Sequence, residues 1–275
     1  MKKISVIVLA FLAISVYSCA PRVYRNTPPT SAPQSEPPAA KETPAPEKPE
    51  PAAPAPAALN VLTSQEKAAG WQLLFDGTST DGWHTYGSKT IGTAWKVANG
   101  ELYVDNNKDG ESKSGGDIIT DKEYSNFELQ IDWKIDKAGN SGICFYIHED
   151  KNKYNWMWGT GPEIQIVDNE GHPDGRIFKH QAGDLYDLMP AQSHAEHPPL
   201  EWNHYLVRSQ NGKLDVYLND VHVISTTLWD DNWRNMIANS KFKNAPDFGT
   251  YRTGHIGLQD HGNNVWFRNI KIKEL

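Results

Sequence analysis

The chain has 275 residues, and its 34 acidic residues outnumber its 27 Lys and Arg residues, giving a formal net charge of −7. This balance argues against a nucleic-acid partner, because domains that bind a phosphate backbone usually show a basic face. The two cysteines, Cys19 and Cys144, are too few for a disulfide framework. Ten Trp and eleven Tyr residues suit sugar stacking or a β-sandwich core, and composition alone favours the core.

The N-terminus carries an export signal. Lys2-Lys3 precede an apolar run over residues 4–16, which predicts a signal peptide over residues 1–18. The run is shorter than the about 20 residues of a membrane-spanning helix. Cys19 follows directly, and its surroundings resemble the bacterial lipoprotein signal, so we expect lipidation at Cys19 and anchoring in the bacterial cell envelope. The alternative is an ordinary signal peptide that is cut nearby.

The next segment, residues 19–58, combines the lipidated cysteine with a tether rich in Pro and Ala. Such a composition has little apolar surface to bury and favours extended, disordered chain. We expect it to act as a spacer that holds the domain away from the membrane. The folded domain is therefore predicted over residues 60–275.

The folded domain is predicted to be all-β, because apolar residues alternate with polar ones along most of it. The clearest strand spans Phe127–Ile135, where every second residue is apolar. Further strands are predicted at residues 94–97, 101–104, 142–147, 163–167, 204–208, 214–218, 221–225, 255–259 and 265–272. One short helix is predicted near residues 232–241. Many strands with hardly any helix indicate a sandwich or jelly roll.

Three connections are longer than a compact β domain requires, namely residues 148–161, 168–202 and 227–253. Long ordered loops usually carry function. The second loop concentrates polar and titratable groups: His172, Asp174, Arg176, His180, Asp184, Tyr186, His194 and His197. This concentration indicates a site, although a solvated polar loop is the alternative and is favoured for His194 and His197.

Several sequence blocks resemble the 3-keto-disaccharide hydrolase domain family, which is common in Bacteroidetes lipoproteins. The blocks that carry the resemblance are residues 70–77, 81–83, 139–143, 161–169, 182–188, 201–203, 257–262 and 265–270. They follow one another in order across about 70–275. The resemblance implies a concanavalin-like jelly roll and the cleavage of glycosides that are already oxidised at C3.

Sugars with a ketone at C3 need a different set of groups from ordinary glycosides. An ordinary glycosidase uses two carboxyl groups, but the residue two positions after Glu163 is the amide Gln165. A C3 ketone acidifies the C2 hydrogen, so a base can remove it and the C1 substituent leaves by elimination, after which water adds. This route needs a base and a group that stabilises the enediolate oxygen. A divalent metal ion is one candidate for the second role.

The candidate catalytic residues are Glu163 as base, His261 as electrophilic or metal-binding partner, and His180. We expect Glu163 and Gln165 to lie on the same face of a sheet as Gln259 and His261, provided that their two strands lie side by side. The expected substrate-binding residues are Asn140, Tyr146, Trp158, Gln165, Asp168, Asp184, Tyr186 and Gln259. No organic cofactor is expected. The alternative function is that of a non-catalytic carbohydrate-binding lipoprotein, in which Glu163 is only a solvated strand residue.

Overall fold

The computed structural model describes residues 58–105 and 115–275. The signal peptide, the lipidation at Cys19 and almost all of the expected tether lie outside these residues and remain expectations. Within the described ranges, no helix is long and apolar enough to cross a membrane.

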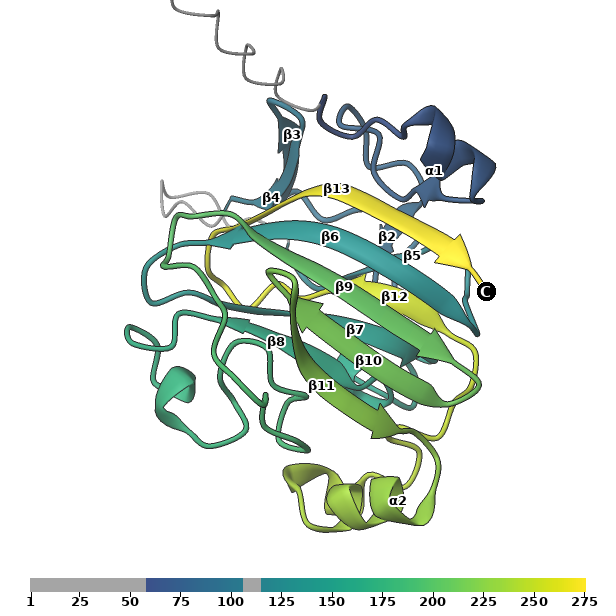
Figure 1. Ribbon diagram of the computed structural model, residues 1–275, viewed down its shortest axis with the longest axis vertical. Helices are drawn as coiled ribbons and strands as arrows, with labels where there is room; N and C mark the ends of the chain where they lie inside the picture. The colour runs from purple at the N-terminus through teal and green to yellow at the C-terminus, as the bar shows by residue number, and fades with distance from the viewer. Residues whose placement is uncertain (1–57, 106–114) are drawn as a thin grey trace, which may run out of the picture. The chain divides into compact units, whose positions relative to one another are not determined.

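Two antiparallel sheets account for most of the described chain (Figure 1). The larger sheet has the order β11 (Val221–Thr227), β10 (Lys213–Leu218), β9 (Asn203–Gln210), β6 (Phe127–Ile135), β13 (Val265–Glu274), β4 (Glu101–Val104) and β3 (Trp95–Ala98), with β1 (Gln72–Leu73) also paired to β13. The smaller sheet has the order β2 (Trp83–Thr85), β5 (Ile118–Thr120), β12 (His255–Leu258), β7 (Asn140–Ile147) and β8 (Glu163–Val167).

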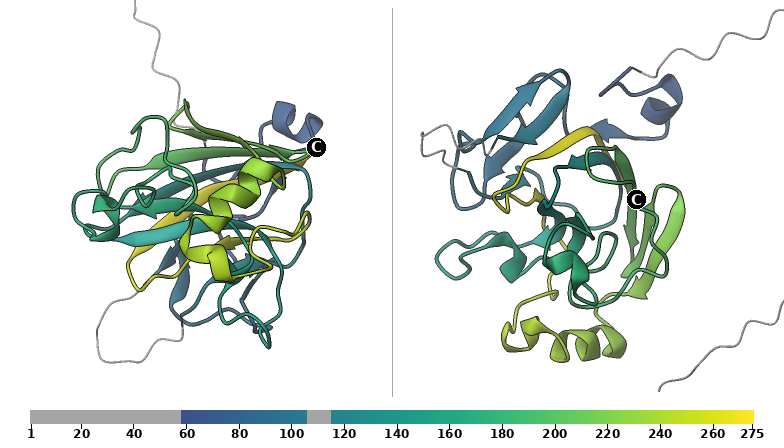
Figure 2. Two further views of the ribbon diagram at one scale, coloured as in Figure 1. Left: turned by 90° about the horizontal axis from the view of Figure 1, so that it is seen from below. Right: turned by 90° about the vertical axis from the view of Figure 1, so that its left-hand side faces the viewer.

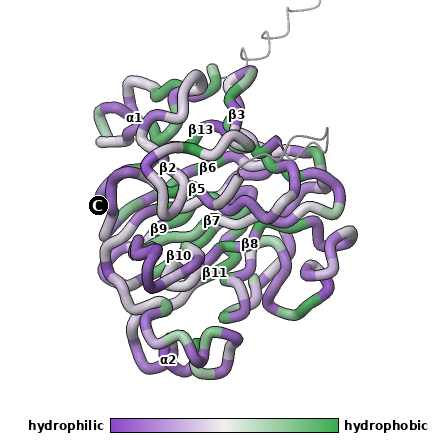
Figure 3. The backbone as a smooth tube through the Cα atoms, turned by 180° about the vertical axis from the view of Figure 1, so that it is seen from behind, coloured by the Kyte–Doolittle hydropathy of each residue, from purple (hydrophilic) through white to green (hydrophobic). Residues whose placement is uncertain are grey.

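The hydrophobic core lies between the two sheets. Leu129 and Ile131 of β6 are fully buried in the same cluster as Ile143 of β7 and Ile164 and Ile166 of β8. In Figure 3 hydrophobic residues mark the strands, while many connecting loops are hydrophilic. This arrangement confirms the predicted all-β sandwich of the concanavalin-like jelly-roll type.

Helices are short and peripheral. They are α1 (Ser64–Ala68), α2 (Asp231–Ala238) and the 3-10 turns η1 (Met157–Gly159), η2 (Asp174–Arg176) and η3 (Lys241–Asn244). The helix expected over 232–241 ends at Ala238, where Asn239 caps it, and the Ser240 side chain then accepts from the Phe242 amide to start η3. Lys241 therefore belongs to a separate turn. Figures 1 and 2 show α2 beyond β11, at the edge of the sandwich.

The outer face of the smaller sheet is shaped by small residues on β7 and β12. Gln259 directly follows β12, and Glu163 starts β8. Because β7 lies between β12 and β8, the two strands are not side by side, which corrects the expectation. Across this row Gly257 is opposite Cys144, and Cys144 is opposite Glu163. Gly142 is opposite Gln165. The residues between the two functional strands therefore leave space above the sheet.

Candidate active site

Glu163 starts β8 and lies on the outer face of the smaller sheet, where 6% of its surface is exposed. Its carboxyl group reaches across the neighbouring strand to Gly142. A Cβ atom at position 142 would come within 2.0 Å of the Glu163 Oε1 atom. Glycine at this position is therefore required for the observed placement of the carboxyl group.

A pocket opens above Glu163 and gathers residues from β7, β8, the segment that follows β12 and all three long loops. It is lined by Asn140, Trp158, Glu163, Gln165, Asp174, Tyr186, Lys241, Gln259 and His261. Seven of these nine were named as site residues from the sequence, and Asp174 and Lys241 were not. Strands that are not adjacent still contribute to one pocket because only glycine and cysteine side chains separate them on β7 and β12.

The electrostatics of the pocket centre on Glu163 and Lys241. Burial raises the pKa of the Glu163 carboxyl group from 4.5 to about 8, and the charges of Asp117 and Asp174 act in the same direction. The Lys241 ammonium group acts in the opposite direction. Lys241 is exposed at the pocket mouth, yet partial desolvation of its ammonium group lowers the pKa of Lys241. Each group thus changes protonation closer to neutral pH than its free counterpart.

Lys241 is held over an aromatic ring at the mouth of the pocket. Its Nζ atom lies 4.0 Å from the centroid of the Tyr186 ring and 5.5 Å from that of Trp158. Its backbone amide donates to the carboxylate of Asp187. These contacts hold the Lys241 cation close enough to Glu163 to affect the pKa of its carboxyl group. Among the described interactions, Lys241 and Glu163 do not form a direct hydrogen bond.

A polar network anchors the opposite wall. Asp174 Oδ2 accepts hydrogen bonds from Asn140 Nδ2 at 3.2 Å and from the Tyr186 hydroxyl at 3.3 Å. In the described part of the chain, the buried oxygens Asn140 Oδ1 and Gln259 Oε1 have no hydrogen-bond partner. A buried acceptor without a partner is costly, so these two atoms are suited to receive donors from a ligand. Sugar hydroxyl groups are such donors.

His261 lies at the exposed rim of the pocket rather than at its base. Its ring meets that of His172 edge to face, with 5.7 Å between the centroids. Burial lowers the pKa of His172, and a charge on His261 acts in the same direction. His261 is therefore placed to exchange protons with solvent and with a ligand group that projects from the pocket.

His180 stands behind the pocket wall and does not line it. Its ring packs on Tyr186 with 4.1 Å between the centroids, and its Nε2 atom lies 3.2 Å from Asp187 Oδ1. Gln165 is fully buried and its Nε2 atom donates to the backbone oxygen of His180 at 3.2 Å. This geometry gives His180 the place of a positioning residue rather than of a group that touches substrate.

Tyr146 was expected to bind sugar, and the structure contradicts this. Its φ angle of 55° breaks the alternation of β7. The side chain consequently packs in the core, where the hydroxyl donates to the Ser125 carbonyl at 2.5 Å and contacts the Ser209 hydroxyl at 2.7 Å. The Tyr146 hydroxyl thus makes its hydrogen bonds inside the sandwich.

Asp168 and Asp184 also lie outside the pocket, because both carboxylates bind backbone amides. Asp168 accepts from the amides of Ala138 at 2.8 Å and Gly171 at 3.0 Å. Asp184 accepts from the amides of Gln181 at 2.8 Å and Ala191 at 2.7 Å. Their roles in this structure are to fold the long loop, which corrects the expectation that they bind substrate.

Aromatic and apolar side chains continue outward from the pocket. Trp158 lines it, and its ring is parallel to that of Trp156, with 6.1 Å between centroids and 5° between planes. Trp156 exposes 55% of its surface. The pair of indole rings therefore extends from the pocket wall into solvent, as expected for an aromatic platform.

A divalent metal ion was one candidate from the sequence, and its possible protein ligands can be checked in the described structure. Among residues 58–105 and 115–275, no three His, Cys, Asp or Glu side chains are arranged to hold a metal ion. The cation within electrostatic range of Glu163 in the described structure is instead Lys241. Lys241 is therefore placed to stabilise negative charge on a ligand in the pocket.

Comparison with known proteins decides the family. Residues 70–273 match the 3-keto-α-glucoside-1,2-lyase-like domain family. A protein from Bacteroides thetaiotaomicron named 3-keto-disaccharide hydrolase is 34% identical over 230 residues, which cover 76% of this chain and 79% of that protein. The chain belongs to the 3-keto-α-glucoside-1,2-lyase-like domain family.

Solved structures agree with this family assignment. A crystal structure from Parabacteroides distasonis, named as a glycosyl hydrolase, superposes with a TM-score of 0.73 at 33% identity. It covers 79% of this chain and 100% of its own. A second crystal structure from the same organism, similarly named, gives a TM-score of 0.54 at 27% identity and covers 74% of this chain and 99% of its own. The sandwich fold is thus shared with solved proteins.

Lys241 was not predicted as a site residue of this family member. It follows the predicted helix, where a lysine is an ordinary surface residue. Only the break at Asn239 and the new turn that starts after Ser240 bring it to the pocket. Asp174 was noted among the titratable residues of the second loop, but nothing in the sequence linked it to Asn140.

Proposed function

We propose that this protein cleaves 3-keto-glycosides by proton abstraction at C2, elimination at C1 and addition of water. The observation that carries the proposal is Glu163, a buried carboxyl group with a pKa of about 8 that lines a pocket together with the Lys241 ammonium group. The family and the 3-keto-disaccharide hydrolase from Bacteroides thetaiotaomicron support the substrate class. A base is most effective when its pKa is near the working pH.

In the first step the Glu163 carboxylate takes the C2 proton of the bound 3-keto sugar. The electron pair of the broken C–H bond forms a C2–C3 double bond, and negative charge moves to the oxygen at C3. The Lys241 ammonium group, held at the pocket mouth over the Tyr186 and Trp158 rings, stabilises this enediolate because a positioned cation acts on the negative charge that develops on the ligand. Lys241 thereby takes the electrophilic role that was expected for His261.

In the second step the C1–O bond breaks and the enediolate electrons return to form a C1–C2 double bond and the C3 ketone. His261, at the rim, donates a proton to the departing oxygen. Water then adds its oxygen to C1 while C2 regains a proton, so the overall change is hydrolysis. Asn140 Oδ1 and Gln259 Oε1 accept from sugar hydroxyl groups throughout, and Trp158 contacts a ring face.

The proposal is tested with a matched pair of substrates, a 3-keto-disaccharide and its parent disaccharide. Product should form only from the keto sugar, because the parent sugar has no acidified C2 hydrogen. In deuterated water the product should carry deuterium at C2. Product without C2 deuterium would rule out elimination, and saturable binding of the keto sugar without product would favour the alternative of a non-catalytic carbohydrate-binding protein.

We also propose that Cys19 carries the lipid that holds the protein in the bacterial cell envelope. The support is its place directly after the apolar run of the signal peptide. The Cys19→Ser variant should move from the detergent-extracted membrane fraction to the soluble fraction, because several acyl chains anchor firmly and none would remain. Cys144→Ser is the control and should leave the partition unchanged. Equal partition of Cys19→Ser and wild type would contradict the proposal.

A further inference from the structure

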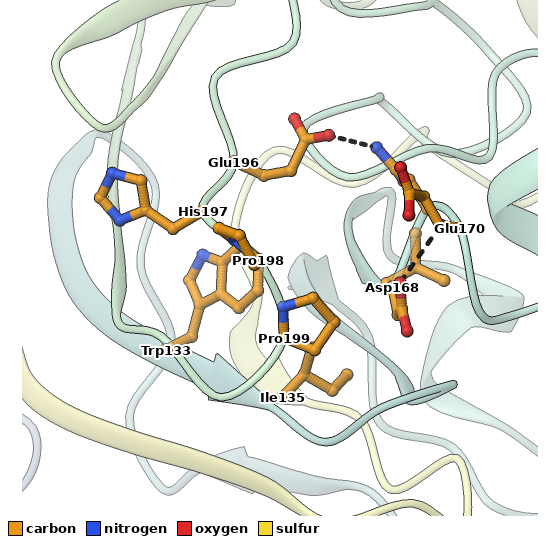
Figure 4. Close-up of a pocket in the computed structure, with 10 residues that line it drawn as sticks. Trp133, Ile135, Asp168, Glu170, Glu196, His197, Pro198 and Pro199 are labelled. Atoms are coloured by element: carbon orange, nitrogen blue, oxygen red, sulfur yellow. Dashed lines mark hydrogen bonds between the residues drawn. The ribbon is translucent and has the colours of Figure 1, made fainter.

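A second cavity, of about 230 Å³, lies where the ends of β6 and β8 meet the segment 196–199 (Figure 4). Its walls are formed by Trp133, Ile135, Val167, Asp168, Asn169, Glu170, Glu196, His197, Pro198 and Pro199. None of these residues lines the pocket that contains Glu163. The cavity is therefore a separate feature of the molecule, and the proposed reaction does not use it.

Two polar atoms in its walls, one hydrogen-bond donor and one acceptor, have no hydrogen-bond partner in the described structure. Trp133 is 1% exposed, and within residues 58–105 and 115–275 its Nε1–H group has no acceptor. In Figure 4 the indole nitrogen points toward the wall formed by His197 and Pro198. Glu196 Oε2 is also buried without a hydrogen-bond partner in the described structure, with His194 Nδ1 at 4.0 Å. Buried polar groups are normally paired, so this donor and acceptor indicate a ligand.

The two groups are held in place by their surroundings. Glu196 Oε1 accepts a hydrogen bond of 2.6 Å from Asn169 Nδ2. The Trp133 ring stacks on Tyr205, with 5.5 Å between the centroids. The Asp168 carboxylate already accepts from backbone amides and is not free for a ligand. The donor and the acceptor therefore have fixed positions within the walls of the cavity.

The charged residues in the cavity walls indicate which chemical class of ligand fits. Asp168, Glu170 and Glu196 carry carboxylates, and the described lining contains neither Lys nor Arg, so an anion is disfavoured. An ammonium group would satisfy Glu196 but cannot accept from the Trp133 indole. Hydroxyl groups both accept and donate, and the indole and proline surfaces suit sugar C–H faces. The cavity is larger than the about 30 Å³ share of one water molecule.

We propose that this cavity, the Trp133–Glu196 cavity, is a second binding site for a neutral monosaccharide unit. A hydroxyl group of the sugar accepts from Trp133 Nε1–H, and a hydroxyl group donates to Glu196 Oε2. The site recognises an intact sugar ring and requires no oxidation at C3. It binds without cleaving, because its described lining contains no Lys or Arg to stabilise an enediolate and the sugar that it binds has no C3 ketone to acidify the C2 hydrogen.

The test uses the ten tryptophan indole N–H signals of the ¹⁵N-labelled protein. Trp133→Phe and Trp158→Phe identify the signals that report on the Trp133–Glu196 cavity and the Glu163 pocket. Methyl α-D-glucopyranoside, methyl β-D-galactopyranoside and N-acetylglucosamine are titrated separately. We expect at least one of them to shift the Trp133 signal saturably while the Trp158 signal stays in place.

Glu196→Ala should weaken this binding about tenfold, since it removes a hydrogen bond to a charged acceptor. Glu201→Ala, an exposed glutamate outside the lining, is the matched control and should leave the affinity unchanged. A Trp133 signal that stays in place with all three sugars up to about 100 mM, two decades above a millimolar Kd, would overturn the proposal. So would a shift that Glu196→Ala does not weaken.

Discussion

Strands of both sheets show apolar–polar alternation. The outer faces differ in the environment of their glutamates, which are ion-paired on the larger sheet and buried on the smaller sheet. On the larger sheet, Glu128 contacts Arg208 at 3.2 Å and Lys273 at 3.0 Å. On the smaller sheet, Glu163 is buried beside glycine, and burial raises the pKa of its carboxyl group. A carboxylate that is paired at the surface serves solubility and modest stability, whereas one that is buried with a raised pKa is available for proton transfer.

The largest expected effect comes from neutralising the buried carboxyl group. Glu163→Gln keeps the shape of the side chain but removes the base, so turnover of a 3-keto-glycoside should fall by about 10²–10⁴. The fold should persist, because no apolar surface is lost. The measurement is product formation. Circular dichroism of the variant is the control for folding. Wild-type turnover in a folded Glu163→Gln variant would show that the buried carboxyl group of the smaller sheet is not the catalytic base.

Removal of the pocket cation should have the next largest effect. Lys241→Met keeps the length of the side chain and should lower turnover by about 10²-fold, because the enediolate loses a charged partner. Since Lys241 lowers the pKa of Glu163, the rising limb of kcat/KM against pH should also move to higher pH in this variant.

The matched control for Lys241 is Lys243→Met, an exposed lysine in the same 3-10 turn. It should leave both the turnover and the pH profile unchanged. An unmoved rising limb in Lys241→Met, together with a lowered rate, would indicate that the lysine acts through structure rather than through its charge.

Burial of Glu163 should also appear in the pH dependence of stability. Its carboxyl group has a pKa of about 8 in the folded protein and an ordinary value near 4.5 in the unfolded chain. The folded state therefore retains a proton that the unfolded chain loses, so the free energy of unfolding falls as pH rises between these values. Each pH unit in this window costs about 1.4 kcal/mol.

Urea denaturation at several pH values measures this effect, with Glu163→Gln as the neutral reference. The variant and the wild type should have similar stabilities near pH 4.5, and the variant should be more stable by a few kcal/mol above about pH 8. A difference between the two proteins that does not change with pH would contradict the raised pKa.

The sequence predicted the strands well where the alternation is long. The strand Phe127–Ile135 was located at both ends, as was 163–167, and the structure places them as β6 and β8. Strands β1, β2 and β5 were missed because two or three residues show no period. Short strands depend on pairing with partners that are distant in sequence, which local patterns do not contain.

The pocket was partly predictable for the same reason. Glu163 and Gln165 were assigned to one face from their spacing, and both line the pocket. Tyr146 was placed wrongly because a residue with φ of 55° shifts the faces of β7, and no side chain in the sequence signals this. Lys241 arrives through a turn that depends on tertiary contacts. Alternation thus identifies a face, while backbone irregularities decide which side chains share it.

The smallest expected effect concerns the paired carboxylate of the larger sheet. Glu128→Gln removes two ion pairs, with Arg208 and Lys273, whose side chains are 44% and 22% exposed. The Glu128 side chain is 14% exposed, so both pairs are partly open to water, and the loss of unfolding free energy should be about 1 kcal/mol and should shrink in high salt. Urea denaturation at low and high salt measures it. Turnover of the 3-keto-glycoside should equal that of the wild type, because Glu128 lies on the outer face of the sheet that does not carry the Glu163 pocket. A clear loss of turnover in a stable Glu128→Gln variant would mean that both outer faces contribute to the reaction, and the contrast between them would fail.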